Sequence, residues 1–334
     1  MAQTKERHWR RWVVLALMIL GPILILVVGG IFVPVQPFIS VAPEKILLEP
    51  IIPNFLGLGP LYLTNTLTTL IATLIMILIL AYFTNRSLKK SQQTDLVPSG
   101  VGNAMEAILE MIYNLTEGSA GQKWVRSVFP WFATILVYVL FANLLRLIPG
   151  FETIGVLHHA EEGIQGYHAV PIGAGPWHWY TAEHGEELLV GFFRGLSVDM
   201  NFTLALALIS VFMTQVIGVR AQGRGYWSKF FNTRRMFKVP FFGAMDFLVG
   251  LLEIISELSK ILSFTFRLFG NMFAGVVLVA IVVSLLGFIT ILPAMLMLFE
   301  LFVGLIQAFV FGMLTMVFMA QATQGHGEEH AEVH

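Results

Sequence analysis

Cysteine is absent from the sequence, and charged residues are scarce. Without cysteine, disulfides and thiolate metal sites are excluded, and the redox compartment stays open. Only 12% of the 334 residues are charged, about half the share found in a soluble domain. The formal net charge of -1 gives no indication of a nucleic-acid partner. Because 56% of the residues are hydrophobic and the mean hydropathy is +0.77, the sequence predicts an all-α polytopic membrane protein.

Apolar runs long enough to cross a bilayer predict about six helices. The predicted spans are 12–33, 61–83, 128–148, 200–219, 245–286 and 294–321. The first run has a rival interpretation as a cleaved signal peptide, but its apolar core is long and no A-x-A cleavage site follows it. We therefore favour a retained helix, followed by an extended segment that contains six prolines.

The last two runs predict a helical hairpin. Residues 245–286 contain no proline, and as one helix they would be roughly 60 Å long at about 1.5 Å per residue. The hydrocarbon core is only about 30 Å thick, so this helix must break or lie steeply tilted. Gly287 and Pro293 suit the turn, and we expect a steep tilt for both arms.

Three segments between or after these runs are more polar. Residues 98–118 have one apolar side, which predicts a helix lying on the bilayer surface. Residues 149–197 hold six glutamates and five of the nine histidines. Their spacing matches no tight metal motif, so a solvated acidic loop is favoured over a metal site. Three histidines spaced by four residues follow near the C-terminus, where a frayed polar tail is favoured over a metal clamp.

The predicted organisation has three parts. They are an N-terminal helix with an extracytoplasmic proline-rich segment at 1–60, a membrane domain at 61–322 that includes the extracytoplasmic 149–197 loop, and a cytoplasmic tail at 323–334.

Lysine and arginine occur mainly in alternate segments between the spans. Residues 1–11, 84–127 and 220–238 hold four, five and six of them, whereas the other segments hold only Lys45 and Arg194. Basic segments remain preferentially in the cytoplasm. With six spans, both termini are therefore predicted to be cytoplasmic and the histidine-rich loop extracytoplasmic.

A stripe of polar residues interrupts the apolar pattern of 245–286. Its members are spaced by three, four or seven positions, so they share one helix face. They are Glu253, Ser256, Glu257, Lys260, Ser263, Arg267 and Asn271. An arginine at membrane depth costs about 2.5 kcal/mol or more, so a partner or a function must retain it. Arg267 is therefore either paired with an acid elsewhere in this chain or a fixed cation on a proton or ion pathway.

The predicted orientation orders the polar groups of the hairpin by depth. The acids of the stripe lie toward the cytoplasm, Arg267 lies near mid-membrane, and Glu300 on the returning arm lies toward the outside. Gln307 lies two turns deeper than Glu300, and Gly304 leaves room between them. The sequence thus offers an acid-lined path from each side with an arginine between them. Arginine suits a divider because its pKa exceeds about 12, so it neither relays nor loses a proton.

Three motifs of the hairpin resemble subunit a of the F-type ATP synthase membrane sector, the ATPase subunit 6 family. They are Ser256-Glu-Leu-Ser-Lys260, Arg267-Leu-Phe-Gly-Asn-Met-Phe-Ala-Gly275 and Leu305-Ile-Gln-Ala-Phe-Val-Phe311. Weaker similarity around Asn143 and Ser197 extends the resemblance over most of residues 129–321.

This resemblance implies a non-catalytic, proton-translocating stator subunit. Two offset half-channels would deliver protons to the c-ring carboxylates and remove them, separated by Arg267. The implied proton-translocation residues are Arg267, Glu300, Gln307, Asn271, Glu253, Ser256, Glu257 and Ser263, with Asn143 as a further candidate in the outer path. The implied partners are the c-ring rotor subunits, the peripheral-stalk b subunits, the rest of the ATP synthase complex and membrane lipid, with no nucleic acid. No cofactor and no bound metal are expected, and the implied location is the inner (plasma) membrane of a bacterial cell.

The sequence departs from the family pattern at three positions. Val276 stands where many relatives have a polar or acidic residue, and Glu300 stands where a histidine is frequent. Glu300 is therefore expected to do alone what an acid–histidine pair does elsewhere. Many relatives have an acid or glycine in place of Arg146, so no part in the outer path is assigned to it. The 149–197 insertion is not common to the family and is also assigned no role.

Two other classes of membrane protein are alternatives. A secondary proton-coupled transporter would use Arg267 to hold a substrate carboxylate, but it should show repeated halves, and no second copy of the Arg267 motif occurs. A purely structural membrane scaffold would leave the polar stripe unexplained. The choice between H+ and Na+ is expected to depend on the c-ring carboxylate site.

Overall fold

A computed structural model describes residues 40–54, 57, 59–92, 101–146, 148, 151–152, 154–159, 166–172, 179–230, 240–286 and 292–324. The predicted helix at 12–33 lies outside the described residues. So do Gly287 of the predicted turn and all but the first two residues of the predicted tail.

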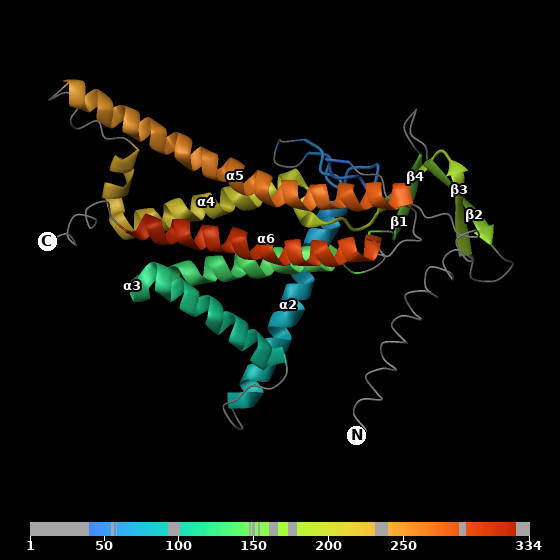
Figure 1. The fold of residues 1–334 in the computed structure, drawn as a ribbon, viewed down its shortest axis with the longest axis horizontal. Helices are drawn as coiled ribbons and strands as arrows, with labels where there is room; N and C mark the ends of the chain where they lie inside the picture. Colours follow the sequence, from blue (N-terminus) through green and yellow to red (C-terminus); the bar gives the residue numbers. More distant parts are fainter. Residues whose placement is uncertain are drawn as a thin grey trace. The chain divides into compact units, whose positions relative to one another are not determined.

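Five helices of the described chain are long and apolar enough to cross a membrane. They are α2 (Asn65–Gln92), α3 (Val101–Arg146), α4 (Met200–Gln222), α5 (Pro240–Leu286) and α6 (Leu292–Thr323), labelled in Figure 1. Two short 3-10 helices flank α4, namely η1 (Leu196–Val198) and η2 (Gly223–Lys229). The predicted all-α polytopic fold with a C-terminal hairpin is confirmed.

The predicted surface helix at 98–118 and the span at 128–148 are the two limbs of α3. The limbs change direction at Gly121, whose φ of 73° and ψ of 165° lie in a region that only glycine adopts readily (Figure 1). A Cβ at Gly121 would have no neighbour within 4 Å. The backbone conformation, rather than crowding, therefore requires glycine at this bend.

The arms of the hairpin are unbroken helices. At about 1.5 Å per residue, the 47 residues of α5 extend roughly 70 Å, more than twice the thickness of a hydrocarbon core. Of the two sequence-based options for this arm, a break does not occur between Pro240 and Leu286. The steep tilt in the membrane stays a prediction.

The chain divides into two compact units. The first comprises Met1–Thr69, Arg146–Gly195 and Met272–Val303, and the second comprises Leu70–Leu145, Leu196–Asn271 and Gly304–His334.

The first unit contains a four-stranded antiparallel sheet, where the sequence predicted a solvated loop (Figure 1). Its strands are β1 (Gly155–His159), β2 (Gly166–Ile172), β3 (Trp179–Gly185) and β4 (Glu187–Gly191), in the order β1-β4-β2-β3. The sequence therefore missed the strands within this segment. The cause is that these short strands mix β-prone residues with glycine, histidine, glutamate and a proline, so they lack the regular apolar–polar alternation that indicates a strand.

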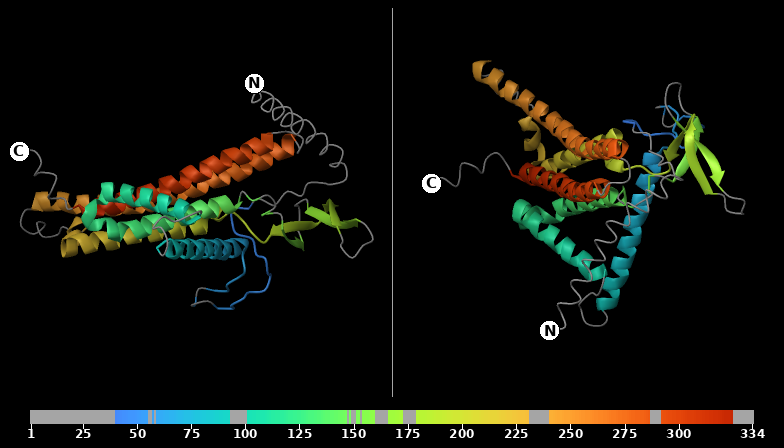
Figure 2. Two further views of the ribbon diagram at one scale, coloured as in Figure 1. Left: turned by 90° about the horizontal axis from the view of Figure 1, so that it is seen from below. Right: turned by 45° about the vertical axis from the view of Figure 1, so that its right-hand side comes forward.

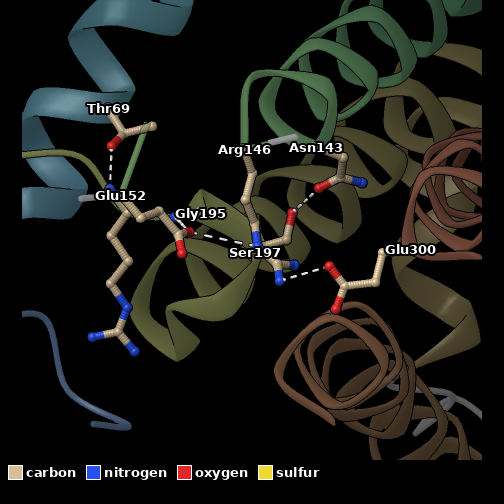
Figure 3. Close-up of polar contacts among 8 residues, drawn as sticks. Thr69, Asn143, Arg146, Glu152, Gly195, Ser197 and Glu300 are labelled. Atoms are coloured by element: carbon tan, nitrogen blue, oxygen red, sulfur yellow. Dashed lines mark hydrogen bonds and ion pairs between the residues drawn. The ribbon is translucent and has the colours of Figure 1, made fainter. Parts of the chain in front are cut away.

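A buried arginine ties the start of the described chain to the rest of the first unit. The Arg194 guanidinium donates to the hydroxyl and the carbonyl oxygen of Ser40 and, at 2.7 Å, to the carbonyl oxygen of Ala42. Its backbone N–H donates to the Thr69 hydroxyl at 2.9 Å (Figure 3). Burial raises the pKa of nearby Glu44, although the Arg194 charge opposes this shift.

The second unit has a core formed by α3, α4 and α6. Val128, Phe132, Ile217 and Met316 are completely or almost completely buried in it. The C-terminal part of α6 runs alongside α4, as the views of Figures 1 and 2 show, and a 2.8 Å hydrogen bond joins the hydroxyls of Ser210 and Thr315. This three-helix core supports the half of α5 that carries the polar stripe.

Aromatic packing fixes that half of α5 against α6. The Phe264 ring lies 4.9 Å from the Phe311 ring and 5.6 Å from the Phe318 ring, measured between centroids. Phe264 and Leu268 are buried, whereas Leu262 and Phe266 on the same helix are more than half exposed. One face of α5 therefore packs within the unit and another is left uncovered by the chain.

Candidate functional site

Arg267 lies on α5 beside the uncovered apolar face. Its side chain is partly exposed, and its Nη2 donates to the Ser263 hydroxyl one turn earlier, at 3.3 Å. Among the residues that the structure describes, no carboxylate lies within ion-pair distance of Arg267. The interpretation of Arg267 as the partner of an acid in this chain therefore has no support in the described residues.

Two predicted site residues meet across the hairpin. The Asn271 side-chain amide on α5 donates to Gln307 Oε1 on α6 at 3.0 Å. These two polar side chains of the hairpin therefore face one another. Gln307 is buried, and its own Nε2 has no hydrogen-bond partner among the described residues. An orphan donor in a buried position costs free energy unless a mobile group such as water reaches it.

Glu300 is paired with Arg146, a contact that the sequence did not predict. Arg146 Nη2 lies 2.9 Å from Glu300 Oε2, and the two side chains are only 8% and 11% exposed (Figure 3). The same guanidinium reaches Glu152 through Nε at 3.5 Å, and Glu152 is 28% exposed. The Gly195 backbone N–H donates to Glu152 at 3.1 Å and holds it in place.

The second carboxylate oxygen of Glu300 faces α5. Glu300 Oε1 is buried and has no hydrogen-bond partner among the described residues. A Cβ at Gly275 would lie 2.7 Å from this oxygen, so the missing side chain makes room for it. Sequence reasoning found Glu300 but missed Arg146, because a pair separated by 154 positions leaves no local signal.

Asn143 connects three elements of the second unit. The Ser197 hydroxyl of η1 donates to Asn143 Oδ1 at 2.6 Å (Figure 3). Its amide donates to the Gly304 carbonyl oxygen on α6 at 3.1 Å. A Cβ at Gly304 would lie 3.2 Å from the Asn143 Cβ, so Asn143 occupies the room that this glycine leaves. Both ends of the Asn143 side chain are therefore engaged in holding helices together.

The predicted inner acids lie near a lysine. Lys260 Nζ donates to Glu257 Oε1 at 2.9 Å and also lies 4.8 Å from the centroid of the Phe318 ring. Glu257 is buried, Glu253 is half-buried, and Ser256 is exposed. The first turns of the stripe thus combine a buried glutamate, whose charge Lys260 compensates, with the more exposed side chains of Glu253 and Ser256.

Tyr226 of η2 is a polar residue beside these acids that the sequence did not indicate. Its ring is buried against Gly218, where a Cβ would lie 2.4 Å from the ring, and its hydroxyl donates to Gln215 at 2.7 Å. Burial, with the Glu257 and Glu253 charges, raises the pKa of Tyr226 to about 12. A tyrosine in a basic loop carries no sequence signal for this position.

The described histidines of residues 149–197 show no metal-binding arrangement. His158 contacts the Ile46 carbonyl oxygen at 3.2 Å, and His159 lies 3.7 Å from Glu186 at an exposed position. In the part of the chain that the structure describes, no three histidine, aspartate or glutamate residues form a group suited to a metal ion.

Comparison with known proteins gives a consistent result across the five helices. The sequence profile of the family described as ATP synthase A chain matches residues 66–320. An ATP synthase subunit a from Helicobacter pylori is 29% identical over 278 residues, which cover 82% of this chain and 97% of that protein. An ATP synthase subunit a from Mycobacterium bovis is 31% identical over 278 residues, covering 82% and 92%. With a match that spans α2 to α6 and includes Arg267, Glu300 and Gln307, this chain belongs to the ATP synthase A chain family.

Proposed function

We propose that this chain is the proton-translocating stator subunit of a rotary ATP synthase. Two offset half-channels deliver protons to the c-ring carboxylates and remove them, and Arg267 separates the half-channels. The observation that carries this proposal is a partly exposed arginine on a mostly apolar helix, with no carboxylate partner among the described residues. In this proposal its compensating charge comes from another molecule.

A carboxylate on a passing rotor subunit fits this requirement. An ionised carboxylate is costly in lipid, whereas its protonated form is tolerated. Opposite Arg267 the ionised form is favoured, because an opposite charge within a few ångströms stabilises it. A rotor subunit therefore loses its proton on reaching Arg267 and needs a new proton before it can return to lipid.

The remaining site residues supply and remove that proton. Glu300, Gln307 and Asn271 form the outer path, in which the part-buried Asn271–Gln307 contact leaves the Gln307 Nε2 donor without a partner among the described residues. Glu253, Ser256, Glu257 and Ser263 form the inner path. Each charge that crosses about 100 mV releases roughly 2.3 kcal/mol, which rotation carries to ATP synthesis in the rest of the complex.

In this proposal Asn143, a candidate for the outer path, has a supporting part instead. Because both ends of its amide are engaged, Asn143 fixes the positions of η1 and α6 rather than relaying protons. Arg146 joins the outer path through Glu300.

The proposed setting follows from the family and the charge distribution. The chain lies in the inner (plasma) membrane of a bacterium with both termini in the cytoplasm, and it contacts the c-ring and the peripheral-stalk b subunits. It carries out no catalysis itself and needs no cofactor. Residues 1–60, 61–322 and 323–334 are its N-terminal segment, membrane domain and tail.

Cysteine cross-linking tests this proposal cleanly, because the natural chain has no cysteine. Leu262→Cys on α5, at a position 55% exposed, should form a disulfide with a cysteine placed near the membrane carboxylate of a c subunit. Ile75→Cys on α2 is the matched control, at a position 51% exposed and away from the stripe. Equal cross-linking at both positions, or none at Leu262, would contradict a rotor-facing α5.

A further inference from the structure

We infer that Glu152, Arg146 and Glu300 form one proton-binding cluster on the outer path, in which Arg146 is a positioning residue shared between the two carboxylates. This inference rests on the proposed function, because it names the group that takes up the incoming proton. It assigns roles to Arg146 and Glu152, to which the sequence assigned none.

The charges of the cluster leave room for one proton. Two carboxylates and one guanidinium carry a net charge of -1, and Arg146 and Glu300 are about nine-tenths buried. A net charge is costly in a buried site, so a cluster of this kind is driven toward neutrality. One bound proton makes the cluster neutral. Among the described residues, the charges that act on Glu300 come from Arg146 and Glu152.

The geometry indicates which oxygen accepts the proton. Arg146 occupies Glu300 Oε2 at 2.9 Å, whereas Glu300 Oε1 is buried without a donor among the described residues. An unsatisfied charged oxygen in a buried site is costly, and a proton on that oxygen removes the cost. Gly275 leaves space beside it on α5, the helix that also carries Arg267.

Glu152 keeps Arg146 compensated while the proton is bound. A protonated Glu300 attracts the guanidinium less, but Arg146 Nε already lies 3.5 Å from Glu152. Glu152 is the most exposed of the three and is anchored by the Gly195 N–H at 3.1 Å. The proton comes from water, binds Glu300 Oε1 and passes on to the next acceptor, so no other bond is formed or broken.

The test measures ATP synthesis by the whole complex in proteoliposomes. The membrane potential and the pH on the head side are held constant, while the pH on the proton-uptake side is varied. The variants are Arg146→Gln, Arg146→Lys, Glu152→Gln and Glu300→Gln. Glu186→Gln is the control, because Glu186 is a strongly exposed acid of the same outer segment.

Removing the positive charge and removing a negative charge of the cluster should shift the pH at half-maximal rate in opposite directions. Arg146→Gln removes a positive charge, so the pH at half-maximal rate should rise by about 1 to 3 units, the range seen for opposite charges at this distance. Glu152→Gln removes a negative charge and should lower that pH. Arg146→Lys should keep the parent midpoint with a reduced maximal rate, because lysine retains the charge but has one nitrogen in place of the two guanidinium nitrogens that reach Glu152 and Glu300. Glu186→Gln should match the parent.

The outcomes separate this inference from the proposed function. A parent-like pH profile for both Arg146→Gln and Glu152→Gln, or shifts of both in the same direction, would overturn the cluster. If Arg146→Gln fails to assemble, the Glu152→Gln profile decides alone, and an unchanged midpoint overturns the inference. A parent rate in Glu300→Gln would instead overturn the outer path of the proposed function.

Discussion

Replacing Gly275 by alanine would place one methyl group against the Glu300 carboxylate. The new Cβ would lie 2.7 Å from Oε1, and ordinary contact begins at 3.4 Å, so this oxygen must retreat by about 0.7 Å. The carboxylate is the far end of a flexible side chain, so the backbone of α6 has no need to move. Alanine also favours a helix interior over glycine by about 0.5–1 kcal/mol. Assembly of the complex should therefore be unimpaired.

The displacement should still slow proton uptake. Misplacing a reacting group by about 1 Å costs on the order of 100-fold, so a shift of about 0.7 Å should cost roughly 25-fold. The rate of ATP synthesis in proteoliposomes at a fixed proton-motive force measures this loss. Gly118→Ala on α3 is the control, because it makes the same change at a helical glycine with no atom within 4 Å. A parent rate in Gly275→Ala, with assembly confirmed, would refute the idea that the position of Oε1 matters.

Three further predictions concern the supports of the site. Asn143→Leu should lower the thermal stability of the purified protein, because the buried Ser197 hydroxyl and the Gly304 carbonyl each lose a hydrogen-bond partner, at a cost of about 1–3 kcal/mol each. Asn114→Leu, at an exposed position of α3, is the control and should leave the stability unchanged. Equal melting temperatures for the two variants would contradict this prediction. The difference in absorbance titration between the parent and Tyr226→Phe should have its midpoint at about pH 12, and a midpoint near 10 would contradict the burial argument. Since the unfolded tyrosine releases its proton first, the stability contributed by Tyr226 is fully present below pH 10 and is lost as the pH rises to about 12. Glu300→Gln should slow proton uptake while the complex assembles normally, and unchanged passive proton flux through the membrane sector would count against the outer path.

The helices could be predicted from the sequence because their signals are local. α4 begins at Met200 as predicted, where the Asp199 side chain accepts the Asn201 N–H at 2.8 Å and caps the helix. The length of α5 follows from a long apolar run without proline. The polar stripe could be placed on one face because helical periodicity alone decides which residues share it.

The pairings within the site could not be predicted in the same way. Arg146 and Glu300 meet only because the end of α3 and the start of α6 belong to one unit of the fold, and their separation in sequence hides this. Gly304 was expected to leave room between Glu300 and Gln307, and only the packing of α3 shows that Asn143 lies against this glycine. The sheet of the first unit was missed because its short strands lack the regular apolar–polar alternation that indicates a strand.

The role of Arg267 as the divider between two half-channels can be measured directly by ATP-driven proton pumping in inverted membrane vesicles. The Arg267→Ala variant should assemble in parent amounts, because the only contact of this guanidinium among the described residues is the Ser263 hydroxyl at 3.3 Å. We predict that pumping and coupled ATP synthesis are both lost in this variant. Pumping at the parent rate in fully assembled Arg267→Ala complexes would contradict the account.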